Sequence, residues 1–289
     1  MNLLPPFQTN KYLKDISTFG IGGPARLFVE VFETSQMQAV LCYCFKMSIP
    51  FFVIGKGSNC LFDDRGFDGL IIQNKISYLK IDGCEVDVGA GYSFSMLGNR
   101  TAKLALGGLE FASGIPATVG GAVFMNAGAN GQETSETLFE VSFVDEEGLL
   151  HSFTKENLQF GYRFSSFQTK KGAIVSAKFR LEASEIARGK QLSIIDYRTQ
   201  TQPYGDLSIG CFFRNPRGDS AGSLIEKAGL KGLTVGGAEV SHKHANFIVN
   251  KQNAIAHDVL ILAKQVQQRV KESMGVELEL EVRCIPYQI

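Results

Sequence analysis

The stretch from Gly107 to Gly131, GGLEFASGIPATVGGAVFMNAGANG, constrains the fold of this chain more than any other. Seven of its 25 residues are glycine, and Glu110 is its only fully charged residue. We expect Gly120, Gly121 and Gly128 to allow positive φ and to let backbone come close to a ligand, which a β-carbon would prevent. Consecutive free N–H groups in such turns bind anions, above all diphosphates. Composition alone leaves open a buried glycine-rich turn that only packs.

A second glycine-rich segment, IPFFVIGKGSNCLFDD, covers residues 49–64. We expect an apolar strand over 51–54 that runs into Gly55-Lys56-Gly57-Ser58-Asn59. This loop nearly fits the dinucleotide fingerprint GxGxxG, but Cys60 stands in place of the third glycine. No acidic residue ends a second strand ~20 residues later, as a Rossmann unit requires. The pattern therefore disfavours a Rossmann fold, and an ordinary strand and turn remains the alternative.

Composition limits the classes of partner. Lys plus Arg and Asp plus Glu number 29 each, so no global field favours nucleic acid or an acidic membrane. The N-terminal residues do not resemble a signal peptide, and no apolar run approaches the ~18 residues of a membrane helix. The six cysteines have neither CxxC metal spacing nor the density of a disulfide framework. We therefore expect reduced thiols, a cytoplasmic location and no metal site.

Hydrophobic periodicity gives a coarse map of the elements. We expect a helix capped by Thr34 or Ser35, a helix over 94–106, and a helix with an apolar face from Val259 to Val270 that stops at Gly275. A hairpin is expected over 138–153, with its turn at 146–148. Further strands are expected at 25–31, 69–74, 76–81, 85–91, 173–182 and, by strict alternation, 276–283. Many strands and few helices predict an α+β chain rather than alternating βαβ units.

The glycine-rich stretches, together with TFGIGGPARLFVEV (18–31), resemble segments of the UDP-N-acetylenolpyruvoylglucosamine reductases. That family usually has glycine where this chain has Ala117. The resemblance implies an FAD-binding domain of the vanillyl-alcohol-oxidase (PCMH-like) type, followed by a smaller α/β substrate domain. It also implies that FAD is held without a covalent bond by two loops, with these residues: Gly55, Lys56, Gly57, Ser58, Asn59, Cys60, Gly114, Ile115, Pro116, Thr118, Val119, Gly120 and Gly121.

The same resemblance suggests how the chain divides. We expect the FAD-binding domain over residues 1–185 and the substrate domain over residues 201–289. The polar, helix-forming residues 186–200 lie between them as a linker, and Pro203 ends that segment.

Three residues match catalytic positions of the family. In FGYRFSSF (160–167), Arg163 corresponds to an arginine that steadies developing charge, and its planar donors suit a carboxylate or enolate oxygen. In SIGCFFRNP (208–216), Cys211 stands where the family has a proton-donating serine. A thiol with a pKa near ~8.5 can take that role. In VELELEVR (276–283), Glu281 matches a catalytic acid. From the residues alone, Arg163 could be a surface charge, Cys211 a packing cysteine and Glu281 a solvated residue.

Six further residues are substrate-binding candidates by resemblance. Tyr162 and Ser165 complete the YRxS element, and the family has arginine followed by QP where this chain has Arg198 and Gln202. Arg214 replaces the family's usual lysine, Asn215 follows it, and His244 lies in GGAEVSHKHANFIVN (236–250). Without triad spacing, His244 is interpreted as a structural or substrate-contact residue rather than a base.

The reaction implied by this resemblance is the reduction of an enolpyruvyl ether of UDP-N-acetylglucosamine to UDP-N-acetylmuramate. NADPH is the co-substrate, FAD the cofactor, and the pathway is bacterial peptidoglycan synthesis. Two alternatives are an alcohol or sugar oxidase of the same flavin superfamily and an inert binding protein of this fold. The GCFFRNP and LELEVR motifs favour the reductase, because neither alternative requires them. Oligomeric state is open, with a monomer as the working expectation.

Overall fold

The computed structural model describes residues 4–288, which divide into two compact units made of separated stretches. Unit 1 contains residues 4–8, 27–56 and 69–198, and unit 2 contains residues 9–26, 57–68 and 199–288. Both units are therefore discontinuous in sequence, whereas the domain boundaries expected above are contiguous. Those boundaries stay a prediction about how the chain is organised.

The main sheet of unit 1 is antiparallel and five-stranded, in the order β12-β11-β15-β7-β6. Its strands are β6 (Leu79–Asp82), β7 (Glu85–Gly89), β11 (Leu138–Asp145), β12 (Leu150–Thr154) and β15 (Gly172–Arg180). The hairpin of β11 and β12 turns at residues 146–149, where Gly148 has φ +89°. This confirms the expected hairpin, and β15 and β7, which follow it on one side in the sheet, confirm the strands expected at 173–182 and 85–91.

A second sheet has the order β1-β2-β5-β3, with β3 parallel to β5. Its strands are β1 (Gln8–Tyr12), β2 (Pro24–Val31), β3 (Phe51–Ile54) and β5 (Phe67–Asn74). Helix α1 (Thr34–Lys46) contributes Met37, Val40, Leu41 and Cys44 to the core of this part of unit 1. Burial raises the pKa of the Cys44 thiol to about 11, as expected for a packing cysteine. The N-cap of α1 is Glu33 rather than the expected Thr34 or Ser35. Phe45, near the end of the helix, is exposed, unlike the four core residues just named.

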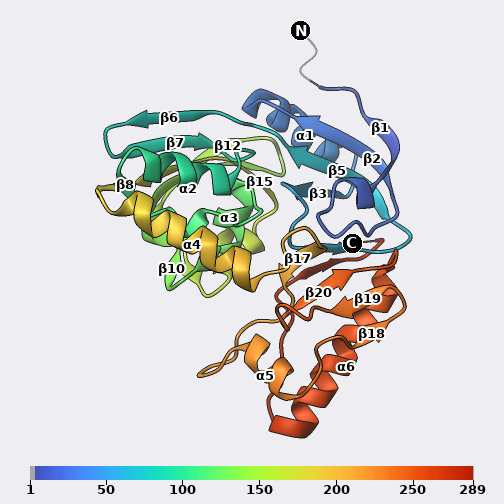
Figure 1. The fold of residues 1–289 in the computed structure, drawn as a ribbon. Coiled ribbons are helices and arrows are strands. Elements are labelled where there is room, and N and C mark those ends of the chain that lie inside the picture. Colours follow the sequence, from blue (N-terminus) through green and yellow to red (C-terminus); the bar gives the residue numbers. More distant parts are fainter. Residues whose placement is uncertain (1–3, 289) are drawn as a thin grey trace. The chain divides into compact units, whose positions relative to one another are not determined.

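Three more helices belong to unit 1, together with short strand pairs (Figure 1). Helix α2 (Phe94–Lys103) begins at the side-chain cap Ser93, and α3 (Val119–Met125) begins at the cap Thr118. Helix α4 (Ala187–Thr201) covers most of the expected linker and continues into unit 2. The strand pairs are β8 (Leu106–Gly107) with β16 (Glu182–Ala183), β9 (Gly128–Ala129) with β10 (Gln132–Glu133), and β13 (Phe160–Gly161) with β14 (Phe164–Ser165).

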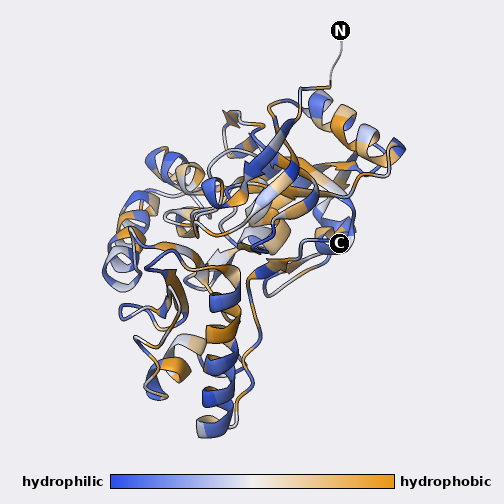
Figure 2. Cartoon of the chain, turned by 90° about the vertical axis from the view of Figure 1, so that its right-hand side faces the viewer, coloured by the Kyte–Doolittle hydropathy of each residue, from blue (hydrophilic) through white to orange (hydrophobic). Residues whose placement is uncertain are grey.

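Unit 2 has a four-stranded sheet of order β17-β20-β19-β18 and two helices. The strands are β17 (Leu207–Cys211), β18 (Thr234–Val235), β19 (Ala238–Val240) and β20 (Phe247–Asn250), and the helices are α5 (Ala221–Lys227) and α6 (Ala256–Met274). Hydrophobic and hydrophilic bands alternate along α6 in Figure 2. Val259, Leu262, Val266 and Val270 are fully buried there, and Gly275 ends the helix with φ +69°, as predicted.

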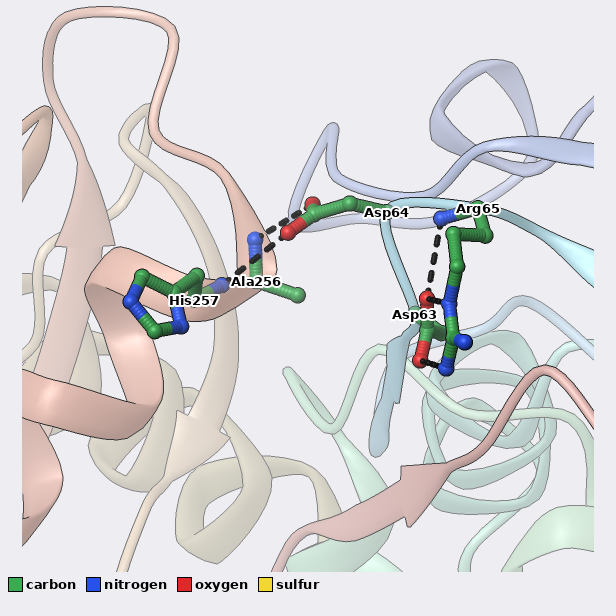
Figure 3. A network of polar contacts seen from close by, with 5 residues as sticks. All are labelled: Asp63, Asp64, Arg65, Ala256 and His257. Atoms are coloured by element: carbon green, nitrogen blue, oxygen red, sulfur yellow. Dashed lines mark hydrogen bonds and ion pairs between the residues drawn. The ribbon is translucent and has the colours of Figure 1, made fainter.

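The first residues of α6 are bonded to a segment far away in sequence. The carboxylate of Asp64 accepts hydrogen bonds from the backbone N–H groups of Ala256 (2.6 Å) and His257 (3.1 Å) (Figure 3). The N-cap is Ile255, whose side chain has no acceptor, so Asp64 takes the place of a local capping residue. Beside it, Asp63 forms an ion pair with Arg65 (2.8 Å).

The C-terminal segment differs from the expected strand over 276–283. Its alternating burial is correct, since Leu278 and Val282 are buried while Glu277 and Glu279 are exposed. The strand itself, β21, covers only Arg283–Ile285 and pairs in parallel with β4 (Cys60–Phe62). The alternating pattern correctly predicted which side chains face the core. It could not predict which residues form the strand, because the strand is defined by its hydrogen bonds to a partner more than 200 residues earlier in the chain.

Candidate functional site

The loop after β3 begins at a glycine that the structure requires. A Cβ on Gly55 would clash with the side chain of Thr118, so Gly55 and the start of α3 meet closely within unit 1. The buried side chain of Gln73, on the neighbouring strand β5, donates from Nε2 to the carbonyl oxygen of Gly55 (3.1 Å). Two neighbouring residues therefore fix where this loop leaves its strand.

The following residues present unpaired backbone donors. Among residues 4–288, no acceptor pairs with the backbone N–H groups of Lys56, Gly57 or Ser58. Gly57 has φ +63°, the left-handed conformation that turns successive N–H groups toward a common anion. The Lys56 ammonium lies 3.3 Å from Ser93 Oγ, and partial burial followed by the charge of Lys75 lowers its pKa. The loop thus fits the diphosphate of a nucleotide cofactor.

The second glycine-rich loop differs from its expected role. Gly120 and Gly121 lie in helix α3 and do not have positive φ, and neither does Gly128. Close approach explains two of these glycines instead: a Cβ on Gly120 would lie 3.0 Å from Ala90 Cβ, and one on Gly128 would lie 2.5 Å from Gln132 O.

Most N–H groups of this loop are already used within the chain. The N–H groups of Val119 and Gly120 donate to the carbonyl oxygens of Tyr92 (2.9 Å) and Ala90 (2.8 Å). Gly114 N–H donates to Ser95 Oγ (2.8 Å), and Gly121 N–H to Thr118 Oγ1 (3.3 Å). The expectation that both loops offer free amides to a diphosphate is therefore wrong for residues 114–121. These residues stay candidates only for contact along a cofactor.

Arg163 lies at the tip of the β13–β14 hairpin in unit 1. Its backbone has φ +56°, which is uncommon for a residue other than glycine. The guanidinium lies over the ring of Tyr162, 4.9 Å from its centre, and donates to the carbonyl oxygen of Gly128 (3.0 Å). Arg198, on α4, donates to the carbonyl oxygen of Gly114 (3.0 Å). The two arginines therefore contact opposite ends of the 114–128 segment.

Cys211 in unit 2 ends strand β17 directly after an irregularity. Ser208 pairs with Val249 and Cys211 with Phe247, so one extra residue is inserted between these pairs. Gly210 has φ +83°, as expected for the glycine of a β-bulge. A bulge changes the direction of the side chain that follows it, and such bulges are common next to active sites.

The segment of Glu281 pairs with the segment of Cys211. Glu281 N–H donates to Phe212 O (2.9 Å), Arg214 N–H donates to Glu279 O (2.8 Å), and Phe213 and Leu280 form an antiparallel bridge. Asn59 joins the same segment on its other side, donating from Nδ2 to Glu281 O (3.4 Å) and accepting from Arg283 N–H (3.0 Å). The GCFFRNP, LELEVR and GSN motifs, widely separated in sequence, are thus adjacent in one unit.

One residue of this cluster was not predicted from the sequence. Asn246 is buried, accepts from Phe213 N–H at Oδ1 (2.9 Å) and donates from Nδ2 to Phe213 O (2.8 Å). Its own carbonyl oxygen accepts from Phe212 N–H (2.7 Å). Asn246 therefore fixes the backbone after Cys211. Its position two residues after His244, inside the family-like segment 236–250, was the only signal in the sequence.

The remaining substrate-binding candidates lie on the surface of unit 2. Asn215 Oδ1 accepts from Ala221 N–H (3.0 Å) at the start of α5, and Gln202 follows the end of α4. His244 packs edge-on against Phe247, with ring centres 4.8 Å apart, and accepts from Asn246 N–H (3.3 Å). These contacts suit the structural role expected for His244, and its contact with substrate stays a prediction.

Cys60 is paired with Arg283 across β4 and β21. Burial raises the pKa of the Cys60 thiol to about 11, against the opposing effect of the Arg283 charge. The same burial lowers the pKa of Arg283. Cys60 thus joins the end of the candidate cofactor loop to this strand pair, and its role at the cofactor stays a prediction.

A strand that opens into a loop of free amides is an arrangement found in nucleotide-cofactor-binding proteins. Residues 25–154 match the FAD binding domain family, and residues 202–285 match the UDP-N-acetylenolpyruvoylglucosamine reductase C-terminal domain family. The chain is thus an FAD-binding oxidoreductase with a second, substrate-specific domain. It belongs to the UDP-N-acetylenolpyruvoylglucosamine reductase family, as the following relatives show.

The reductase of Protochlamydia amoebophila is 57% identical over 291 residues, which cover 100% of this chain and 97% of the relative. That of Chlamydia muridarum is 48% identical over 277 residues, 96% of this chain and 93% of the relative. The crystal structure of the reductase from Thermus caldophilus superposes with a TM-score of 0.84 at 36% identity. It covers 97% of this chain and 100% of that chain. These matches confirm the family resemblance and the fold expected from the motifs.

Among residues 4–288, no helix is both long and apolar enough to cross a membrane.

Proposed function

We propose that the protein reduces UDP-N-acetyl-3-O-(1-carboxyvinyl)-glucosamine to UDP-N-acetylmuramate with NADPH as co-substrate and non-covalent FAD as cofactor. The observation that carries this proposal is the backbone pairing between the Cys211 and Glu281 segments in unit 2. An oxidase of the same superfamily or an inert binding protein has no use for a proton donor and an acid held on paired segments.

We assign FAD binding to residues whose hydrogen-bond donors and charge suit its diphosphate. The free N–H groups of Lys56, Gly57 and Ser58 would hold the diphosphate, with the Lys56 ammonium nearby. When bound, the flavin supplies two-electron transfer between NADPH and the enolpyruvyl double bond. No residue of the two glycine-rich loops is a histidine, and the assignment is to a non-covalent complex.

The chain's own side chains supply charge stabilisation and a proton. Arg163 would bind the carboxylate of the enolpyruvyl group through its paired donors, and Glu281 would act as an acid. Cys211 would give the proton from Sγ to the α-carbon, which completes the lactyl ether. The bulge at Gly210 and the three bonds of Asn246 hold the donor's backbone in place.

The experiment that tests this proposal uses the purified protein. We expect a yellow protein whose flavin appears in the supernatant after acid precipitation. NADPH should bleach the flavin, and the enolpyruvyl sugar nucleotide should restore its colour in the absence of oxygen. A flavin that stays with the precipitate contradicts the non-covalent assignment. A reduced flavin that the sugar nucleotide does not reoxidise contradicts the proposed reaction.

A further inference from the structure

The backbone of Arg163 is held in a conformation that needs support. A side-chain-bearing residue at φ +56° is strained, and such strain persists only where the surrounding contacts over-determine it. The two strands of its hairpin, Phe160–Gly161 and Phe164–Ser165, are only two residues each. So short a ladder fixes the tip weakly, and the support must come from residues outside it.

Gln168 provides that support through its amide group. Its Nε2 donates to the carbonyl oxygen of Arg163 (3.0 Å) and to the carbonyl oxygen of Phe124 (3.0 Å). Phe124 lies in the last turn of α3, where helix carbonyls have no partner within the helix. Ser165 Oγ donates to the same carbonyl oxygen (2.7 Å). Both donor hydrogens of one amide are therefore used to join the Arg163 peptide to the end of a helix.

Helix α3 extends this connection to the candidate cofactor loops. Its first residues follow Thr118, whose side chain lies against Gly55. At its other end, the buried Asn126 donates from Nδ2 to Gly161 O (3.0 Å), one residue before the hairpin tip. The seven residues of α3 are thus a short element of unit 1 between Gly55 and Arg163.

We propose that Gln168 is a positioning residue for the reaction: it holds Arg163 in its left-handed conformation, and so fixes the guanidinium relative to α3. This inference rests on the proposed function, because it assumes that Arg163 binds the substrate carboxylate. Gln168 itself touches neither substrate nor cofactor. Its amide acts through the Arg163 peptide, because one NH₂ group donates to both carbonyl oxygens.

The test compares Gln168→Met with Gln38→Met in the flavin-loaded protein. Gln38 is a matched control, because its Nε2 also donates to a backbone carbonyl oxygen of unit 1, that of Gly148 (3.1 Å), far from Arg163 in sequence. For Gln168→Met we expect reoxidation by the sugar nucleotide to fall by about 10–10²-fold, the cost of a misplaced binding group. Reduction by NADPH should change by less than about twofold, and Gln38→Met should leave both steps unchanged.

Two further measurements separate positioning from general destabilisation. In the Arg163→Ala background, Gln168→Met should change reoxidation by less than about twofold, because the two residues act as one unit. A crystal structure of Gln168→Met should show Arg163 out of positive φ and its guanidinium away from Gly128 O. If Gln168→Met does not fold, Gln168→Glu replaces it, since its carboxylate keeps the size but opposes both carbonyl oxygens.

The outcomes distinguish this inference from the proposed function. If Arg163→Ala is slow but Gln168→Met reoxidises at the parent's rate, Gln168 does not position Arg163 and the proposed function stands. Losses that simply add in the double variant also overturn the inference. If Arg163→Ala itself reoxidises at the parent's rate, the assigned role of Arg163 is wrong, and the role of Gln168 falls with it.

Discussion

Replacing Asp64 by alanine removes the acceptor that α6 lacks locally. Two backbone N–H groups, those of Ala256 and His257, lose their bonds of 2.6 and 3.1 Å. Loss of a capping side chain costs ~0.5–2 kcal/mol, and loss of a negative charge at a helix N-terminus costs a further ~0.3–1 kcal/mol. Because both bonds come from one carboxylate, we expect a loss of about 2 kcal/mol for Asp64→Ala, near the middle of the summed range.

Thermal unfolding is a direct measure of this loss. For a chain of this size each kcal/mol lowers the Tm by roughly 2–4 °C, so Asp64→Ala should lower it by about 4–8 °C. Asp64→Asn keeps one of the two acceptors and should lose about half as much. Asp63→Asn is the neighbouring control. It breaks the Arg65 pair, which is exposed, and should lower the Tm least of the three.

The reasoning fails if Asp64→Ala unfolds within about 1 °C of the parent, a change too small for the loss of a helix cap. Water would then satisfy the first N–H groups of α6 as well as the carboxylate does. Equal losses for Asp63→Asn and Asp64→Ala would show that the segment responds to net charge rather than to capping.

Three other predictions concern the site and the response to pH. Cys211→Ser should keep substantial activity, while Cys211→Ala should slow reoxidation by ~10²–10⁴-fold in single-turnover kinetics and leave reduction by NADPH intact; an unchanged rate would make Cys211 a packing residue. Glu281→Gln should lower turnover by roughly 10²–10³-fold and Glu279→Gln hardly at all, and equal losses would place the acid at the wrong position. The hydrogen bond from Arg65 lowers the pKa of Asp63. This pair therefore stabilises the fold at pH values above the ordinary carboxylate pKa, and the stability is lost as the pH falls through the lowered pKa. Urea midpoints of parent and Asp63→Asn should therefore differ at pH 7 and converge at acid pH.

Local sequence patterns predicted helices and turns correctly where the deciding residues lie close together in the sequence. The apolar spacing of α6, its stop at Gly275 and the turn of the β11–β12 hairpin all depend on residues close in sequence. The N-terminal cap of α6 could not be predicted, because Asp64 is 192 residues away from Ala256. For the same reason, β21 was predicted too early and too long, since its partner is β4.

The glycines in the sequence predicted where the backbone is constrained, but not the physical reason for each constraint. The sequence suggested positive φ at Gly120 and Gly128, whereas neither has it: a Cβ would be crowded at Gly120 and would clash with Gln132 O at Gly128. Arg163 also has positive φ, but because it is not a glycine, glycine content could not indicate this. The family resemblance named Arg163, Cys211 and Glu281. It could not name Gln168 or Asn246, because their roles depend on hydrogen bonds to backbone groups of distant segments.

The division of unit 2 into three stretches has a consequence for the order of folding. Its first stretch, residues 9–26, packs with residues after 199, such as Ile209 and Phe212. Strand β4 likewise depends on β21, which lies more than 200 residues later in the chain. Asn59, at the end of the candidate cofactor loop, bonds to a segment 222 residues later. Non-local pairs of this kind close slowly, so this end of the loop reaches its final form only after the distant segment has been synthesised and has paired with it.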